Sequence, residues 1–167
     1  MIPVKGSRYS IRDLVRDEAL AKKYEDGTCL VFRLCVHHYH RYAYPDNGRK
    51  TKNTFIPGVL HTVRPVALRE LPVFTENARE YTVLRSENFG DVLQMEVGAM
   101  LVGKIDNYHQ EADVRRGQEK GRFLYGGSTI ILLLEPGTVA VTEKFFEATR
   151  TGEETEVKMG EAIGRRG

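Results

Sequence analysis

The chain has 167 residues, of which 41% are hydrophobic, and this suits one domain with its own core. Its formal net charge is only +2 and no basic stripe runs along it, so we expect no nucleic-acid partner. No apolar run reaches the length of about 18 residues that spans a bilayer. The first residues, "MIPVKGSRYS", lack the layout of a signal peptide.

The two cysteines, Cys29 and Cys35, lie in "TCLVFRLCV", which has the pattern of a strand. Six positions along a strand span roughly 20 Å, too far for a disulfide within that strand. We therefore expect two reduced thiols, which is typical of a cytoplasmic protein.

The N-terminal half predicts one helix followed by short strands. The apolar residues of 10–25 recur at helical spacing behind Ser10, a suitable N-cap, and predict one amphipathic helix docked on the β core. Asn-Gly in "YPDNGRK" predicts a β-hairpin, because glycine accepts a positive φ. The elements expected here are the helix 10–25, a turn at 25–28, a strand over 28–36, the hairpin at 44–50 and strands within 53–63 and 79–85.

The second half predicts further strands. "DVLQMEVGAMLVGKI" alternates, which places one set of residues on a buried face and Gln94, Glu96 and Lys104 on the opposite, polar face. Residues 106–122 are polar and predict a loop, 128–135 predict a central strand, and the tail predicts a last short β element. The predicted fold is mainly β (β-barrel or sandwich-like, α+β) with one N-terminal amphipathic helix, as a single domain over 1–167. The buried face is expected to hold Leu93, Met95, Val97, Ala99, Leu101 and Ile105.

Histidines in "HHYH" raise the possibility of a metal site. On a strand, His38 and His40 would share one face, and His61, His109 or a carboxylate could complete a zinc site. The alternative is a polar strand end that leads into a hairpin. Since the chain has neither a cysteine pair nor an HExxH spacing, we expect no metal.

Two glycine-containing stretches could carry other chemistry. In "FLYGGSTIILLL", the Ser128 hydroxyl could attack the carbonyl of Gly127, since glycine removes Cβ crowding at a strained turn. The alternative is an ordinary turn before a strand. "GAMLVG", residues 98–103, could line a pocket with small residues or pack as a plain strand.

In this order the motifs resemble those of the phosphatidylserine decarboxylase proenzymes, over nearly the whole chain. The matching stretches have the patterns KGxxYS, YHR, VGAxxVG, GxExGxFxxGST and MGExIG. They are "VKGSRYS", "CLVFRLCVHHYHRY", "IPGVLHTVRPVA", "ENAREY", "ENFGDVLQMEVGAMLVG", "RGQEKGRFLYGGSTIILLLEPG" and "GEETEVKMGEAIG".

The resemblance implies a lyase that cuts itself at Gly127–Ser128 and keeps a pyruvoyl group made from Ser128. The larger chain would be 1–127 and the smaller, pyruvoyl-bearing chain 128–167. The group would form a Schiff base with phosphatidylserine and accept the electrons released with CO2, giving phosphatidylethanolamine. His40, of YHR, matches the family histidine of the decarboxylation step. No metal is implied.

The sequence departs from the family at the residues that activate the serine. In the commonest family motif, DYHRxH, the second histidine is the base; Ala43 stands there, and His38 replaces the aspartate. A second aspartate lies upstream of KGxxYS in the family, whereas Asp26-Gly27 lies downstream and predicts a turn. Loss of a general base typically costs about 10²–10⁴-fold in rate, so we expect impaired self-cleavage. His61 is the candidate substitute base.

The resemblance also bears on partners and location. It implies a phospholipid substrate, peripheral contact with the inner face of the cell membrane and a cytoplasmic location, and it allows a homodimer. Membrane contact is expected to be weakened, because the family's N-terminal helices are absent from this sequence. Ala43 and the short N-terminus are each either natural or introduced. The alternative function is a non-catalytic homologue, or a trapped proenzyme, that binds phospholipid head groups.

Overall fold

A computed structural model describes residues 2–4, 7–35, 37–59, 61, 73–99, 104–124 and 128–167, and gives the backbone alone for 2–4, 7–9 and 128. Its helices are α1 (Ile11–Val15), α2 (Glu18–Lys23), α4 (Val73–Glu76) and α5 (Glu143–Thr151). Its strands are β1 (Ile2–Val4), β2 (Ser7–Tyr9), β3 (Thr28–Leu34), β4 (Arg41–Ala43), β5 (Gly48–Lys50), β6 (Thr54–Ile56), β7 (Arg79–Ser86), β8 (Gly90–Val97), β9 (Lys104–Asn107), β10 (Ala112–Val114), β11 (Glu119–Leu124), β12 (Ser128–Leu134), β13 (Val139–Val141) and β14 (Gly164–Arg166).

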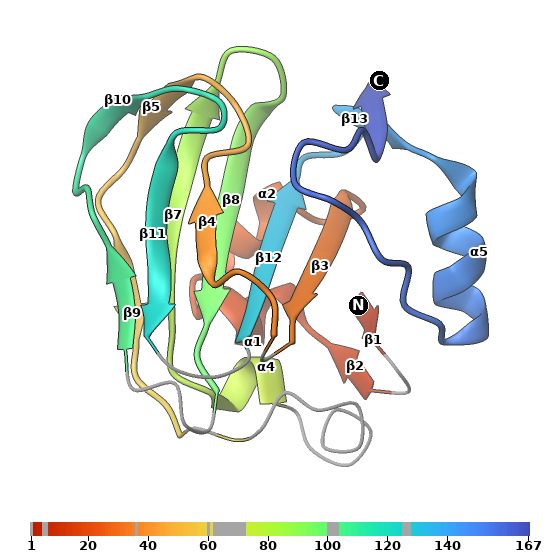
Figure 1. Cartoon of the computed structure of the whole chain (residues 1–167), viewed down its shortest axis with the longest axis horizontal. Coiled ribbons are helices and arrows are strands. Elements are labelled where there is room, and N and C mark those ends of the chain that lie inside the picture. The colour runs from red at the N-terminus through yellow and green to blue at the C-terminus, as the bar shows by residue number, and fades with distance from the viewer. Residues whose placement is uncertain are drawn as a thin grey trace.

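The described strands form antiparallel sheets, so the prediction of a mainly β protein is confirmed. The main sheet has the order β10-β5-β7-β8-β12-β3, with β6 paired to β7, and a second sheet has the order β4-β11-β9. The smaller sheet covers one face of the main sheet, α1 and α2 lie behind the other, and α4 lies at the lower ends of the strands (Figure 1). Within the described ranges neither sheet closes on itself, so the barrel form of the prediction is wrong.

The single helix expected over 10–25 is replaced by two short helices. Ser10 caps α1 as predicted, because its Oγ accepts a hydrogen bond from the Asp13 amide at 3.2 Å. Arg16 then turns left-handed at φ 53° and ends α1. Asp17 caps α2 by accepting from the Leu20 amide at 2.9 Å. The second cap interrupts the helical stripe that the apolar spacing predicted.

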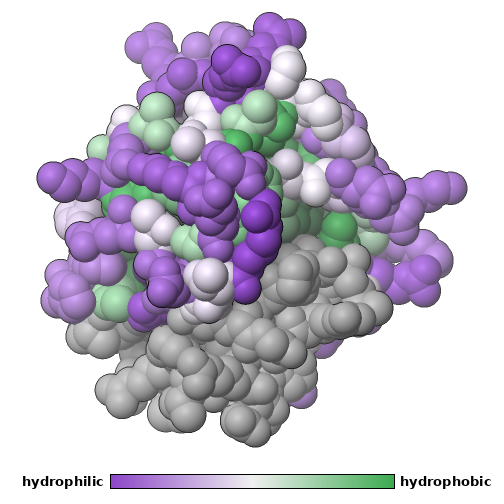
Figure 2. Space-filling model, turned by 90° about the vertical axis from the view of Figure 1, so that its right-hand side faces the viewer, coloured by the Kyte–Doolittle hydropathy of each residue, from purple (hydrophilic) through white to green (hydrophobic). Residues whose placement is uncertain are grey.

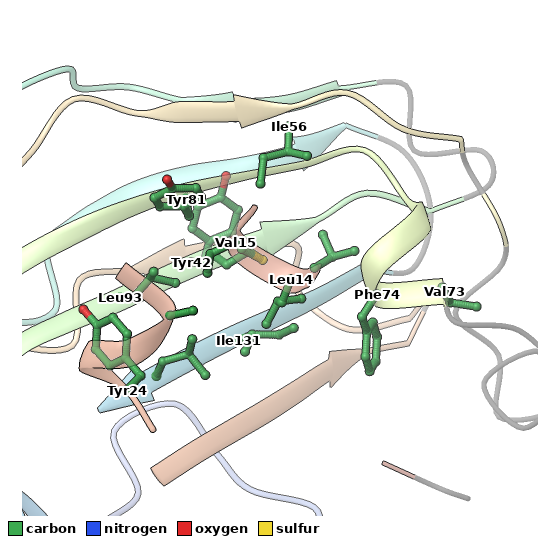
Figure 3. Packing of buried hydrophobic residues seen from close by; sticks show 14 of the residues in the cluster. Leu14, Val15, Tyr24, Tyr42, Ile56, Val73, Phe74, Tyr81, Leu93 and Ile131 are labelled. Carbon is green, nitrogen blue, oxygen red and sulfur yellow. The ribbon is translucent and has the colours of Figure 1, made fainter. Parts of the chain in front are cut away.

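The apolar residues of these two helices pack onto the main sheet, as expected. Leu14, Val15 and Tyr24 are at most 2% exposed and belong to the cluster that contains Leu93 and Ile131 (Figure 3). This cluster, which also takes in Tyr42 of β4 and Phe123 of β11, is the main hydrophobic core. It holds the strand ends near α4 in place, where the candidate site lies (Figures 1 and 3).

The hairpin predicted at 44–50 does not form. β4 pairs with β11 in the small sheet, whereas β5 pairs with β7 and β10 in the main sheet. The chain crosses between sheets here, because buried Asp46 accepts hydrogen bonds from Ser86, Asn88 and Arg116 instead of closing a local turn. These bonds hold the pKa of Asp46 at about 2, against the opposing effect of burial.

Two other predictions concern the segment that follows β7, namely the buried and polar faces of its strand and the loop at 106–122. Leu93, Met95, Val97 and Ala99 are buried as expected. Glu96, placed on a polar face, is also buried, at 0% exposed, because the small sheet covers that face. That sheet uses β11, which lies in the segment 106–122 predicted as a loop. Leu101 falls outside the described residues, and Ile105 is half-buried in β9.

β12 lies between β8 and β3, so the central strand predicted at 128–135 is confirmed. The short β element expected in the tail is β14, which pairs with β13. Both cysteines are free thiols, as expected. Burial raises the pKa of the Cys29 thiol to about 12. Among the described residues, no helix is long and apolar enough to cross a membrane.

Candidate active site

Strand ends from both sheets meet near α4, at the lower end of the molecule in Figure 1. Ser128 is the first residue of β12 and pairs with Leu34, the last residue of β3. Thr129 pairs with Val97, the last residue of β8. Gly126 and Gly127 fall outside the described residues, as do residues 100–103 of the "GAMLVG" stretch. The backbone of Ser128 therefore begins a buried strand at this end.

His40 lies at the same end. It precedes β4, and its carbonyl accepts a hydrogen bond from the Phe123 amide, near the end of β11, at 2.9 Å. The chain returns from β11 to Ser128 within a few residues. The His40 Nε2 atom is buried and finds no hydrogen-bond partner among the described residues, and the same is true of Thr129 Oγ1. Buried polar atoms are rarely left unsatisfied, so each of these two atoms is available to a further hydrogen-bonding group.

Arg41 secures this placement of His40. Its guanidinium forms an ion pair with Glu119 of β11, and the Tyr108 hydroxyl donates to the same carboxylate at 2.9 Å. Arg41 belongs to the YHR motif, and Glu119 belongs to the GxExGxF motif. Two separate motifs are thus joined in space, and their contact fixes β4 against β11.

Ala43 lies at the other end of β4. The Gln94 side-chain amide donates to its carbonyl at 3.2 Å, and Gln94 pairs with Leu132 in β12. Leu132 and Ser128 are separated by about 13 Å along the strand. The backbone of residue 43 therefore lies beside the middle of β12 rather than beside its first residue.

The structure does not bring the "HHYH" histidines together on a strand face. β3 ends at Leu34, and the His38 amide turns back to the Cys35 carbonyl at 2.9 Å. The His38 Nδ1 accepts from the Cys35 amide at 3.1 Å, which occupies that nitrogen. His109 lies beyond the far end of β9, where its Nδ1 contacts the Tyr44 hydroxyl at 3.1 Å. Among the described residues, no group of three potential ligands gathers for a metal ion.

His61 is held at the Ser128 end by Asn77. The Asn77 amide is buried; it accepts from the His61 amide at 2.9 Å and donates to the His61 carbonyl at 2.8 Å. The same nitrogen donates to the Gly98 carbonyl at 2.6 Å. The His61 ring contacts Glu76 of α4, with 2.8 Å between Nε2 and Oε2. Sequence reasoning had named His61 but neither partner.

A buried ion pair lies between the two sheets and was missed by sequence reasoning. Lys120 of β11 donates to Glu96 of β8 at 2.6 Å and to Asn107 at 2.8 Å, and both charged side chains are 0% exposed. Burial raises the pKa of Glu96, and the Lys120 ammonium opposes that shift. Glu96 faces Ile130 in the register, two residues after Ser128. The alternating sequence of β8 places Glu96 on one face of the main sheet, but it does not indicate that this face is also covered.

Comparison of the sequence with protein families gives the class of protein, an enzyme made as a proenzyme. The family model for phosphatidylserine decarboxylase matches residues 1–165. The chain belongs to the phosphatidylserine decarboxylase family.

Several curated relatives support this assignment. A phosphatidylserine decarboxylase proenzyme 2 of Clostridium acetobutylicum is 47% identical over 96% of this chain and 55% of its own length. A phosphatidylserine decarboxylase proenzyme of Clostridium tetani is 43% identical over 99% of this chain and 57% of its own length. One of Clostridium botulinum (strain Hall) is 44% identical over 96% of this chain and 55% of its own length. The chain therefore spans about half the length of the curated relatives it matches.

Proposed function

We propose that this chain is the part of a phosphatidylserine decarboxylase that cuts itself at Gly127–Ser128 and carries the resulting pyruvoyl group on Ser128. The observation that carries the proposal is the buried, unpartnered Nε2 of His40 at the end of the molecule where β12 begins. Thr129 Oγ1, equally buried and unpartnered, directly follows Ser128. Both atoms fit a ketone or carboxyl oxygen as hydrogen-bond partner.

Self-cleavage uses only the chain's own atoms and water. The Ser128 oxygen attacks the Gly127 carbonyl carbon, the Gly127–Ser128 amide bond breaks, and an ester replaces it. Removal of the Ser128 Cα proton then expels the Gly127 carboxylate and leaves a dehydroalanine. Water replaces its nitrogen, which leaves as ammonia, and a pyruvoyl group remains. The products are 1–127 and 128–167.

In the decarboxylation, the pyruvoyl group supplies the electron sink for the bond that breaks when CO2 leaves. His40 has the task of delivering a proton to the substrate carbon, which suits an imidazole near neutral pH. The Arg41–Glu119 ion pair holds β4 against β11 and so keeps His40, the residue before β4, in position. The buried strand ends around it exclude water from the reacting carbon.

We propose that processing is slow, because Ala43 cannot take a proton. This supports a second candidate, a homologue that stays uncut and binds phospholipid head groups. The substrate of the active form is phosphatidylserine, reached by peripheral contact at the inner face of the cell membrane. On the α5 side, charged and polar residues cover most of the described surface, with hydrophobic residues between them (Figure 2).

Intact mass measurement followed over a long incubation tests the processing step. We expect the 19.0 kDa chain to give the fragments 1–127 and 128–167. The fragment 128–167 should be blocked to Edman degradation. In the presence of phosphatidylserine, borohydride should reduce the Schiff base that this fragment forms with the lipid. A chain that stays whole would favour the head-group-binding homologue.

The His40→Ala variant tests the second step. We expect it to cut itself at the unaltered rate but to lose phosphatidylethanolamine formation by about 10²-fold or more, since it lacks the proton donor. Radiolabelled CO2 release from phosphatidylserine vesicles is the measurement, and His37→Ala, which alters an exposed neighbour, is the matched control. Full decarboxylation by His40→Ala would contradict the assigned role.

A further inference from the structure

We propose that the end of the main sheet at which β12 begins is a docking surface for the phospholipid bilayer that presents the substrate. The surface, called the docking rim, consists of Tyr39, Phe55, Pro57, Val59 and Lys104, all of which are exposed. This inference rests on the proposed function and deepens it, because it assigns the membrane contact to particular residues of this chain.

Exposed apolar side chains line the edge of the main sheet on and after β6. Phe55 is 60% exposed, Val59 is 53% exposed, and Pro57 between them is also exposed. Among the described strands, β6 pairs with β7 alone, so these residues lie at an edge of the sheet. Single exposed apolar residues are common on protein surfaces, whereas a group of three within five positions indicates a contact surface.

The strand register places this group at the end of the sheet where β12 begins. Ile56 of β6 pairs with Arg79 of β7, which pairs with Val97, the last residue of β8. Val97 in turn pairs with the second residue of β12. Val59 lies farther out, because it pairs with Asn77, the residue that follows α4. The exposed segment therefore continues past the last row of the sheet.

Tyr39 adds an aromatic side chain at the same end of the molecule. It is 70% exposed and directly precedes His40, whose carbonyl is bonded to the Phe123 amide near the end of β11. Of the six large hydrophobic residues that are exposed in the described part of the chain, Tyr39, Phe55 and Val59 lie at this end. Half of the exposed hydrophobic side chains thus gather around the candidate active site.

Lys104 adds a positive charge at the same level of the small sheet. It is the exposed first residue of β9 and pairs with Leu124, the last residue of β11. Asn107, at the other end of β9, donates to Glu96 of β8 at 3.2 Å, so Lys104 lies about 10 Å from that contact toward the end of both sheets. Among the described residues, Lys104 has no ion-pair partner.

Three properties of the docking rim favour a bilayer over another protein chain. Pro57 has no backbone N–H, so a further strand cannot pair regularly along this edge. The unpaired Lys104 ammonium complements the negative surface of a bilayer that contains phosphatidylserine. Exposed aromatic and aliphatic side chains enter the boundary between head groups and acyl chains, where a tyrosine keeps its hydroxyl in water. In this orientation His40 lies near the membrane from which the proposed substrate comes.

Fluorescence tests the orientation, because the chain contains no tryptophan and an introduced one reports only on its own surroundings. We expect the emission of Tyr39→Trp and of Val59→Trp to shift to the blue with phosphatidylserine vesicles and to be quenched by brominated acyl chains. Phe146→Trp, at an exposed position of α5, is the matched control and should stay unquenched. Quenching of the α5 probe, or of none of the three, would overturn the inference.

Vesicle sedimentation tests the two contributions separately. The double variant Phe55→Ser/Val59→Ser should bind vesicles at least about tenfold more weakly, because it loses two inserted apolar side chains. Lys104→Gln should weaken binding to phosphatidylserine vesicles by about fivefold and leave binding to neutral phosphatidylcholine vesicles unchanged.

Lys22→Gln is the matched control for the charge. Lys22 is exposed on α2, next to Lys23, which forms an ion pair with Asp91 near the start of β8, at the opposite end of the sheet. We expect this variant to bind both kinds of vesicle as the unaltered chain does. A dimer of the unaltered chain that Phe55→Ser/Val59→Ser abolishes, with vesicle binding unchanged, would show that a second copy occupies the rim and would overturn the inference.

The outcomes distinguish this inference from the proposed function, because vesicle binding requires neither self-cleavage nor decarboxylation. Loss of turnover on vesicles by Phe55→Ser/Val59→Ser, with turnover of dissolved short-chain phosphatidylserine retained, would support both. Binding through the rim without decarboxylation of either substrate would support the inference and overturn the proposed function. Decarboxylation on vesicles that the double variant leaves unchanged would overturn the inference alone.

Discussion

Individual polar residues distinguish two places in this protein, the Ser128 end of β12 and the space between the two sheets. At the Ser128 end, His40 has a buried nitrogen that no described residue satisfies, whereas the His61 ring contacts Glu76 and the His61 backbone is bonded to Asn77. Between the sheets, Lys120 donates to Glu96 Oε2, while Glu96 Oε1 is buried and has no hydrogen-bond partner among the described residues. The unpartnered His40 nitrogen leaves the first place open to a further hydrogen-bonding group, whereas the second place is a buried ion pair.

The buried ion pair yields a prediction at this scale. Removing one partner with Lys120→Met should lower the free energy of unfolding by about 3–5 kcal/mol, because it leaves an uncompensated buried carboxylate. The double variant Glu96→Gln/Lys120→Met should recover much of that loss. Urea unfolding of the two variants and the unaltered chain is the measurement. Equal destabilisation by the single and double variants would show that the uncompensated charge is not the cause.

At the scale of elements, one side chain connects the helices to the sheet. Arg79 of β7 is 0% exposed and donates to the carbonyls of Asp13 and Leu14 in α1 at 2.8 and 2.7 Å. It also donates to the carbonyls of Thr75 and Asn77 at 2.8 and 2.9 Å. The guanidinium therefore holds α1 and α4, the helix that carries Glu76, against the main sheet.

Substituting this side chain tests the connection. Arg79→Lys should lower the free energy of unfolding by about 2–4 kcal/mol, because one ammonium cannot reach all four carbonyls that the guanidinium satisfies. Hydrogen exchange should also accelerate at the amides of α1. Arg85→Lys, on an exposed position of the same strand, is the matched control. Unchanged exchange in α1 would contradict this role.

At the scale of the whole molecule, a buried lysine makes stability depend on pH. Lys50 is 0% exposed and donates to Asn53 and to the His109 carbonyl, each at 2.7 Å. Burial lowers its pKa to about 8. Between that value and its ordinary value of 10.5, the unfolded chain binds more protons than the folded one, so stability rises with pH.

The corresponding prediction compares how the free energy of unfolding depends on pH in the unaltered chain and in the Lys50→Met variant. The free energy of unfolding of the unaltered chain, relative to that of Lys50→Met, should rise by about 1–3 kcal/mol from pH 7.5 to pH 10. Denaturant unfolding at several pH values measures it. The comparison cancels the opposite contribution of Cys29, whose raised pKa lowers stability as the unfolded thiol ionises. A difference that stays constant across this range would contradict the lowered pKa of Lys50.

The sequence by itself determined the features that depend on local order. Alternation in β8, the apolar run of β12 and the Ser10 cap all follow from residues close together in the chain, and each was predicted. The collinear motifs determined the family in the same way. His40, His61 and Ser128 could be named because they lie within or beside those motifs.

Only the tertiary structure decided what depends on contacts between distant residues. Asp46 bonds to residues about 40 to 70 positions away, so Asn-Gly forms a crossing between sheets rather than a hairpin. The small sheet buries Glu96, although its spacing resembles that of a solvent-facing residue. Asn77 and Glu76 hold His61 near Gly98, just beyond the end of β8, a relation that no motif expresses. Local spacing fixes which face a side chain takes, but only packing decides what covers that face.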